Sequence, residues 1–261
     1  MTSMIYSRGG EEGIALFRSV LVGPQLAGWI TQIDARYQTL EAARRQGGAA
    51  AVSQLVPPGE RFVPTASSVT IGAVLSDENL RALLAGISAG SAGEWIKDEF
   101  GNRSACDLDQ AWVRRQYAPG KYPPLHAPHG WHQDGALRFD YLSHPDGIFP
   151  RDALLPVATC WIALGPCGVE APGLEIIAHR LDGLLAPAEL ADERVRTRFA
   201  AEEFWRPVLA PGDALLFRGD ILHRTHVTRA MTKDRTSIEL RFFPGDNCPA
   251  RLKGDRFIPL F

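Results

Sequence analysis

The segment Pro211-Gly212-Asp213-Ala214-Leu215-Leu216-Phe217 joins a turn signal to a short apolar run. Proline and glycine favour tight turns, and a short apolar run after such a turn is typical of a buried β-strand. From about residue 108 onward, similar runs follow one another between Gly and Pro residues, which predicts successive strands. The expected strands are Ala111–Tyr117, Val157–Leu164, Leu174–Ile177, Trp205–Leu209, Ala214–Phe217, Ile221–Val227 and Thr236–Phe243.

The first hundred residues show helical periodicity instead. Between Pro24 and Gln46, apolar side chains recur at steps of three and four residues, so they share one helix face. Pro24 suits the first turn, and Gly47-Gly48 predicts the end of this helix. Ser76 is expected to cap a second helix. The buried stripe of that helix would be Leu80, Leu83, Leu84 and Ile87.

Helices followed by many closely spaced strands predict a mainly β fold with flanking helices. A parallel α/β fold would need a helix between most strands, and the C-terminal half offers one candidate, the charged segment Leu181–Phe199. A jelly roll, with two packed antiparallel sheets, fits this order best. We expect one domain over residues 1–261, with a helical part at about 1–108 and the jelly-roll core at about 109–245.

The composition of the chain excludes several classes of protein. The 261 residues are 45% hydrophobic and 22% charged, with a formal net charge of -2, so nothing in the charge predicts a nucleic-acid partner. We find neither a signal peptide nor a run of roughly 18 apolar residues, so we expect a cytoplasmic protein without a membrane span. The four cysteines have no C-x-x-C spacing and are expected to be reduced thiols.

A candidate metal site begins at Trp131-His132-Gln133-Asp134-Gly135. In a strand, residues two apart point to the same face, so His132 and Asp134 could place an imidazole nitrogen and a carboxylate oxygen on one metal. A second histidine from elsewhere would complete the two-histidine, one-carboxylate set of non-haem Fe(II) oxygenases. The other H-x-D triplet, His144-Pro145-Asp146, is followed by Gly147 and is expected to be a turn.

The third ligand is expected in the C-terminal strands, where His223 and His226 compete. They are three residues apart and should point to opposite faces of a strand. His223 shares its face with Thr225, and Arg235 opens the next strand. Arginine suits a carboxylate that needs a bidentate, permanently charged partner. A cavity lined by a histidine, a hydroxyl and an arginine would serve both a metal and a dicarboxylate, which favours His223 over His226.

In these residues the chain resembles the phytanoyl-CoA dioxygenase family of Fe(II)/2-oxoglutarate oxygenases. The likeness covers about residues 110–243 and rests on four blocks in order. These are Trp131–Gly135, Cys160–Leu164 with Gly173–His179, Pro211–His223 and Arg235–Ile238. The family's P-G-S-H turn is replaced here by Ile177-Ala178-His179-Arg180, a departure that concerns the local loop.

The resemblance implies a double-stranded β-helix, the cupin-like form of the jelly roll. It implies Fe(II) on His132, Asp134 and His223. It also implies a 2-oxoglutarate C5 carboxylate on Arg235, assisted by Thr225. The residues expected to line or reach the co-substrate pocket are Trp161 and Gln116.

The implied activity is that of a dioxygenase that consumes O2 and 2-oxoglutarate, releases succinate and CO2, and hydroxylates a C–H bond of a small molecule. An amino-acid derivative or a biosynthetic intermediate is expected as substrate. Asp134 argues against a halogenase, which replaces this carboxylate with a small residue. The same scaffold could instead catalyse desaturation, epoxidation or epimerisation.

Two further alternatives are a jelly-roll protein that binds metal or ligand without turnover and a zinc hydrolase, although neither explains Arg235.

Five other residues remain open from the sequence. Arg138 is a candidate for binding a charged group of the substrate. His126 and His129 are expected to be loop histidines, with a contact at the pocket rim as the alternative. Arg114 and its neighbour Arg115 should point to opposite faces of one strand, without a sequence signal for which faces inward.

Overall fold

The computed structural model describes residues 4–6, 13–56, 62–65, 67–72, 76–121, 127–138, 149–150, 156–245 and 257–261. The helices are α1 (Gly23–Ser53), α2 (Asp77–Ser88), α3 (Ser91–Phe100) and α4 (Asp192–Arg198). The strands of the N-terminal half are β1 (Met4–Tyr6), β2 (Ile14–Phe17), β3 (Phe62–Pro64), β4 (Ser68–Gly72), β5 (Ser104–Asp107) and β6 (Trp112–Gln116). The later strands are β7 (Phe149–Pro150), β8 (Ala158–Ala163), β9 (Gly173–Ile177), β10 (Gly183–Leu184), β11 (Phe204–Trp205), β12 (Ala214–Arg218), β13 (His223–His226), β14 (Arg235–Pro244) and β15 (Phe257–Pro259).

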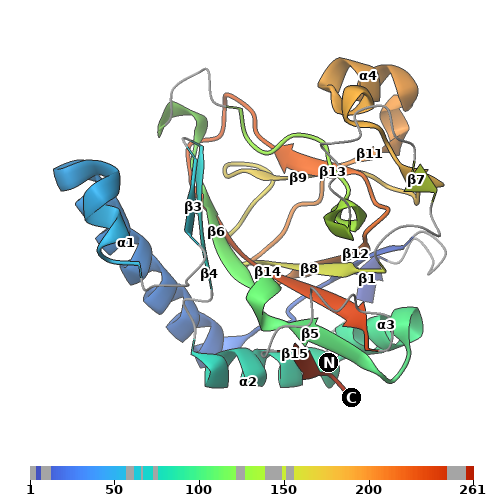
Figure 1. Ribbon diagram of the computed structural model, residues 1–261, viewed down its shortest axis with the longest axis horizontal. Helices are drawn as coiled ribbons and strands as arrows, with labels where there is room; N and C mark the ends of the chain where they lie inside the picture. The colour runs from blue at the N-terminus through green and yellow to red at the C-terminus, as the bar shows by residue number, and fades with distance from the viewer. Residues whose placement is uncertain are drawn as a thin grey trace.

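Two antiparallel sheets face each other (Figure 1). In the described residues the larger sheet has the order β1-β2-β12-β8-β14-β6-β4-β3; in addition, β5 pairs with β14, and β15 pairs with β5. The smaller sheet has the order β11-β9-β13. Helices α1, α2 and α3 lie along the outer side of the larger sheet. This architecture confirms the predicted jelly roll with flanking helices.

Alternation along the central strands divides the core into two layers. On β14, Ile238, Leu240 and Phe242 belong to a cluster with the apolar residues of the helices. Successive residues of a strand point to opposite faces, so Arg235, Glu239 and Arg241 point toward the smaller sheet. Trp161 of β8 lies on that inner side, in a second apolar cluster with residues of the smaller sheet. The space between the sheets therefore contains both apolar and charged side chains.

Helix α2 agrees with its prediction, whereas two other helices differ from theirs. The Ser76 side chain accepts a hydrogen bond from the Asn79 amide at 3.2 Å, which caps α2. Helix α1 continues past Gln46 to Ser53, and its backbone leaves helical geometry at Gly48, where φ is 66°. The predicted helix over Leu181–Phe199 is wrong in its first half. Helix α4 covers Asp192–Arg198, and a short strand, β10, lies before it.

The N-terminal part contains strands in addition to the expected helices. Strand β2 pairs with β12, and β4 pairs with β6, so both extend the larger sheet. These strands are short and buried on both faces, and such runs lack the alternation that identifies a half-buried strand. Trp205–Leu209 is shorter than predicted, because only Phe204–Trp205 forms β11.

Candidate metal and co-substrate site

Two segments that are distant in sequence meet at the edge of the smaller sheet. His132 forms an isolated antiparallel bridge with His223, and their backbone amides and carbonyls exchange hydrogen bonds of 2.9 and 3.0 Å. The segment that contains His132 and Asp134 is not the strand that we predicted. Asp134 begins a 3-10 helix at 134–138. The side chains of His132 and Asp134 come together because the backbone turns after the bridge between His132 and His223. Strand alternation is not the cause.

A close backbone contact fixes this turn. The Gly135 amide donates to the Gly219 carbonyl at 2.8 Å. A Cβ atom added at Gly219 would lie 2.9 Å from the Gly135 Cα atom, so a side chain there would push the turn away.

His132, Asp134 and His223 each offer one ligand atom, and these atoms all lie within 4.8 Å of one another. His132 Nδ1 lies 2.8 Å from the Gly130 carbonyl. His223 Nδ1 lies 3.0 Å from the Ile221 carbonyl. A carbonyl can only accept, so each Nδ1 carries the proton and each Nε2 lone pair is left for a metal. Two neutral imidazoles and one carboxylate fit Fe(II).

The carboxylate of Asp134 is held from one side. Its Oδ2 atom lies 3.1 Å from Arg241 and accepts a hydrogen bond from the Thr159 hydroxyl. Its Oδ1 atom lies 3.8 Å from His132 Nε2. Burial by itself would raise the pKa of Asp134, but Arg241 and the hydrogen bond from Thr159 hold this pKa below its usual range. The carboxylate is therefore ionised.

Both candidate histidine ligands are neutral for a common reason. Burial lowers the pKa of His132 to about 3, and the neighbouring His223 adds to this shift. Burial also lowers the pKa of His223. A neutral imidazole is the form that binds a metal, so no proton has to be displaced near neutral pH.

A cavity of about 510 Å3 extends from these three residues to Arg235. Arg235 is 1% exposed, and its guanidinium lies 4.9 Å from the centre of the Trp161 ring. Its Nε and Nη1 atoms have no hydrogen-bond partner in the described part of the chain. Burial lowers the pKa of Arg235 to about 10, so the group stays charged at neutral pH. A buried cation with unused donors is costly unless an anion binds to it.

Three more of the expected co-substrate residues can be located. Thr225 and Trp161 both line the same cavity. Gln116 lies opposite Arg235 on the neighbouring strand β6. Its amide nitrogen donates to the Ser67 carbonyl at 2.7 Å, whereas its Oε1 atom is buried without a partner among the described residues. Gln116 is not among the lining residues of the cavity.

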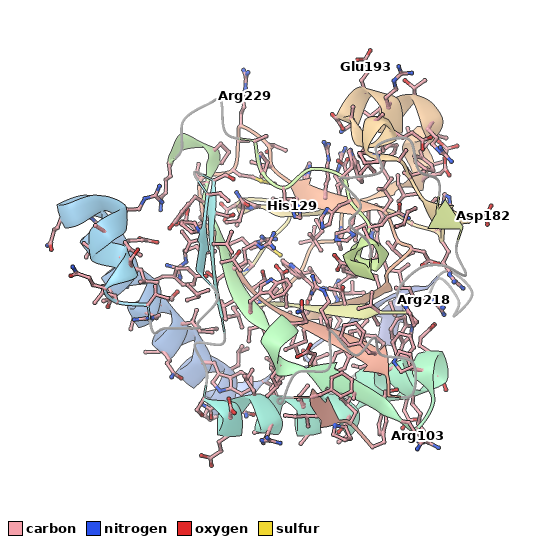
Figure 2. All side chains as sticks on the ribbon, viewed as in Figure 1. Arg103, His129, Asp182, Glu193, Arg218 and Arg229 are labelled. Carbon is pink, nitrogen blue, oxygen red and sulfur yellow. The ribbon has the colours of Figure 1, made fainter. Side chains whose placement is uncertain are left out.

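The remaining sequence candidates have different outcomes. His226 lies on the opposite face of β13 from His223 and does not line the cavity. His129 lines the cavity, with its ring centre 3.8 Å from that of His132, and Figure 2 shows it between the two sheets. His126, His144, Asp146, Cys248 and the side chain of Arg138 lie outside the described residues. The other three cysteines are buried free thiols.

Sequence reasoning missed a charged group on the inner faces of β6 and β14. Arg114 lies 3.3 Å and Arg241 3.7 Å from the Glu239 carboxylate, which also accepts a 2.7 Å hydrogen bond from Trp112 Nε1. Burial by itself would raise the pKa of Glu239, but Arg114 and Arg241 hold it below its usual range. The available signal was the alternation of the strand, which places three charged residues, Arg235, Glu239 and Arg241, on one face.

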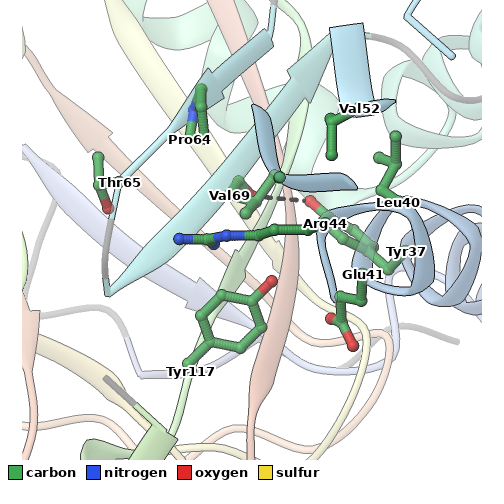
Figure 3. A pocket seen from close by; sticks show the side chains of 10 residues that line it. Tyr37, Leu40, Glu41, Arg44, Val52, Pro64, Thr65, Val69 and Tyr117 are labelled. Carbon is green, nitrogen blue, oxygen red and sulfur yellow. Dashed lines mark hydrogen bonds between the residues drawn. The ribbon is translucent and has the colours of Figure 1, made fainter. Parts of the chain in front are cut away.

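A second cavity, of about 460 Å3, lies between α1 and the strand pair β3–β4 (Figure 3). Tyr37 lines it and donates a hydrogen bond to the Val69 carbonyl at 2.9 Å. None of the three candidate metal ligands lines this cavity, so it is separate from the site between the sheets.

No protein-family model matches this chain, and no curated protein matches its sequence. No helix of the described residues is long and apolar enough to cross a membrane.

Solved structures do resemble the chain. The epimerase SnoN in complex with Fe3+, alpha ketoglutarate and nogalamycin RO superposes with a TM-score of 0.55 and 15% identity, over 96% of this chain and 95% of that chain. EctD from S. alaskensis with 2-oxoglutarate and 5-hydroxyectoine has a TM-score of 0.60 and 13% identity, over 93% of this chain and 77% of that chain. HygX from Streptomyces hygroscopicus with nickel, 2-oxoglutarate and hygromycin B has a TM-score of 0.53 and 12% identity, over 95% of this chain and 93% of that chain. At such low identities the likeness shows the fold alone, and this chain shares that fold over nearly its whole length.

Proposed function

We propose that this chain is an Fe(II)- and 2-oxoglutarate-dependent oxygenase that hydroxylates a C–H bond of a small molecule. One observation carries the proposal. The cavity that contains His132, Asp134 and His223 also contains Arg235, a fully buried cation with unused hydrogen-bond donors. A metal site alone needs no such cation, whereas a dicarboxylate co-substrate does.

Each group has a separate task in this proposal. His132, Asp134 and His223 would hold the iron, which supplies oxidation of a C–H bond coupled to decarboxylation of 2-oxoglutarate to succinate and CO2. Arg235 would bind the C5 carboxylate through its free guanidinium nitrogens, with the Thr225 hydroxyl beside it. Trp161 packs against that guanidinium and helps to exclude water from the ion pair.

Two independent lines support this proposal. The sequence resembles the phytanoyl-CoA dioxygenase family in four ordered blocks, and each of its expected ligands faces one cavity. Structures of similar fold contain Fe3+ or nickel together with the co-substrate. SnoN is an epimerase, so this fold also accommodates another outcome, and epimerisation is the alternative to hydroxylation.

The test is anaerobic addition of Fe(II) and then 2-oxoglutarate to the metal-free protein, followed by visible spectroscopy. We expect a weak metal-to-ligand charge-transfer band in the wild type. The band should be absent in Asp134→Ala, which loses the anionic ligand. In Arg235→Gln it should need about tenfold or more 2-oxoglutarate, because a charge-assisted pair is lost.

A variant that keeps the charge provides the control. Arg235→Lys keeps the cation but loses the planar pair of donors, so its 2-oxoglutarate affinity should lie between those of wild type and Arg235→Gln. A folded, iron-loaded wild type without the band would contradict the oxygenase and favour a non-catalytic binding protein. Formation of succinate without added substrate would in turn exclude that alternative.

A further inference from the structure

The charges that line the site between the sheets do not balance. Three guanidinium groups, those of Arg114, Arg235 and Arg241, face two carboxylates, those of Asp134 and Glu239, among the described residues. A histidine that binds a metal through its ring nitrogen is neutral, so His132 and His223 add no charge to the metal-loaded site. A divalent metal adds two positive charges and 2-oxoglutarate adds two negative ones, so one positive charge remains uncompensated. In a buried site of low polarity, such an excess favours a ligand that brings one negative charge.

Arg114 is the group with which that ligand can pair. Arg235 is assigned to 2-oxoglutarate, and Arg241 is shared between Asp134 and Glu239. Arg114 is the least buried of the three guanidinium groups, with its side chain 17% exposed. Its Nε atom has no hydrogen-bond partner in the described part of the chain, although Glu239 lies 3.3 Å away. A single Glu239 cannot neutralise two arginines, so Arg114 retains capacity for a second anion.

The surroundings of Arg114 place it toward the entrance of the cavity. Its Nη1 atom lies 3.4 Å from Nδ1 of His129, an exposed residue that stacks on the metal-side histidine His132. His129 Nδ1 can accept a hydrogen bond from Arg114, and this contact would orient the guanidinium.

Apolar side chains also line the cavity. Trp112, Leu174 and Phe217 are among its lining residues, together with Arg114 and the candidate metal ligands. A substrate anchored at Arg114 by an anionic group would therefore lay an apolar, C–H-bearing body toward the metal. Such an anchor would restrict which C–H bond is presented, which is how a fixed orientation contributes to catalysis.

We propose that the substrate is a small organic monoanion, of which a carboxylate is the class that fits best, and that Arg114 binds its anionic group. A carboxylate matches the planar fork of arginine and carries the single charge that the site lacks. This inference rests on the proposed function, because the charge balance includes the metal and 2-oxoglutarate.

The test compares carboxylates with their uncharged primary amides, which have nearly the same shape. Protein loaded anaerobically with Fe(II) and 2-oxoglutarate is titrated with phenylacetate, phenylacetamide, butyrate and butyramide. Binding is followed by calorimetry and by the shift of the visible band. In the wild type we expect each carboxylate to bind about tenfold or more tightly than its amide. Arg114→Gln should reduce this preference to about equal binding, and Arg114→Lys should keep part of it.

A neighbouring residue supplies the matched control. Arg115 lies on the outer face of the same strand, paired with Asp34 of α1. Arg115→Gln removes the same charge from the chain without touching the cavity, so the carboxylate preference should be unchanged. Thermal unfolding of each variant reports whether it folds. The comparison of each carboxylate with its amide in wild-type protein does not depend on the folding of any variant.

Each outcome has one meaning. Equal binding of carboxylate and amide by wild type, no binding of either carboxylate, or an unchanged preference in folded Arg114→Gln would overturn the inference. Formation of the charge-transfer band in that same sample would show that the proposed function still stands. If wild type forms no band, the proposed function fails, and the inference fails with it because its charge balance includes the metal and 2-oxoglutarate.

Discussion

Arg241 lies 3.1 Å from Oδ2 of Asp134, on the opposite side of the carboxylate from the oxygen that faces His132. The Thr159 hydroxyl donates to the same Oδ2 atom. Two donors on one oxygen hold the carboxylate in a single orientation and leave the other oxygen for a metal. Partners of this kind commonly matter to a metal site nearly as much as the ligands themselves.

We therefore expect Thr159→Val and Arg241→Leu each to weaken Fe(II) affinity by about 10- to 100-fold. Competition with a coloured chelator under anaerobic conditions measures the affinity directly. Thr159→Ser keeps the hydroxyl and should retain affinity within about twofold of wild type. Metal binding that does not change in Thr159→Val would mean that the hydroxyl does not orient Asp134.

The two histidines of β13 allow a paired comparison. His223 faces the cavity, whereas His226 lies on the other face of the same strand. His223→Ala should abolish Fe(II) binding, because it removes one of the three proposed ligands. His226→Ala should leave binding unchanged. Loss of metal in His226→Ala with retention in His223→Ala would reverse our assignment of the third ligand.

Gln133 connects the ligand segment to two other loops. Its amide nitrogen donates to the carbonyls of Gly183 and Asp220, both at 2.9 Å, and its Oε1 atom accepts from the Leu185 amide at 2.8 Å. Gln133→Leu would leave three buried backbone groups without these partners. We expect a loss of about 2–3 kcal/mol in the free energy of unfolding, measured with urea.

The control for this variant is the exposed Gln38 of α1. Gln38→Leu should change the free energy of unfolding by less than about 0.5 kcal/mol. Equal effects of the two substitutions would show that the hydrogen bonds of Gln133 contribute little to stability.

Glu175 makes the stability of the smaller sheet depend on pH. Its buried carboxylate accepts hydrogen bonds from Arg206 at 2.8 Å and Arg224 at 2.6 Å. Burial by itself would raise its pKa, but these arginines hold the pKa below the usual 4.5. The unfolded chain therefore binds this proton first as pH falls. The stabilisation is fully present above about pH 4.5 and is lost as pH drops below it.

Glu175→Gln should lower the free energy of unfolding at pH 7 by about 1–2 kcal/mol, a value reduced by the exposure of its partners. The difference from wild type should shrink below pH 4.5, where the wild-type carboxyl takes up a proton. Urea unfolding at a series of pH values tests both statements. A difference that stays constant down to the acid limit would show that the ionised carboxylate is not the source of the stability.

Local patterns in the sequence identified several parts of this protein. Alternation placed His223 and Thr225 on one strand face, and the structure shows both lining the cavity. The cap at Ser76 and the apolar stripe of α2 were also predicted, because capping and helical periodicity depend on residues a few positions apart. The H-x-D spacing correctly indicated that His132 and Asp134 lie together. They do so through a helical turn that begins at Asp134, whereas we assumed strand alternation.

The way in which these local elements combine depends on long-range contacts in the folded chain. Alternation predicts that Arg114 and Arg115 point to opposite faces, but both faces of this sheet are covered, by helices on one side and by the smaller sheet on the other. A sequence pattern cannot distinguish two buried faces, so the inward position of Arg114 had to come from the fold. The bridge between His132 and His223 joins segments about ninety residues apart, and no local propensity encodes such a contact. Local sequence patterns identified which residue types are available to a metal and a dicarboxylate, whereas long-range strand pairing is what brings these residues to one cavity.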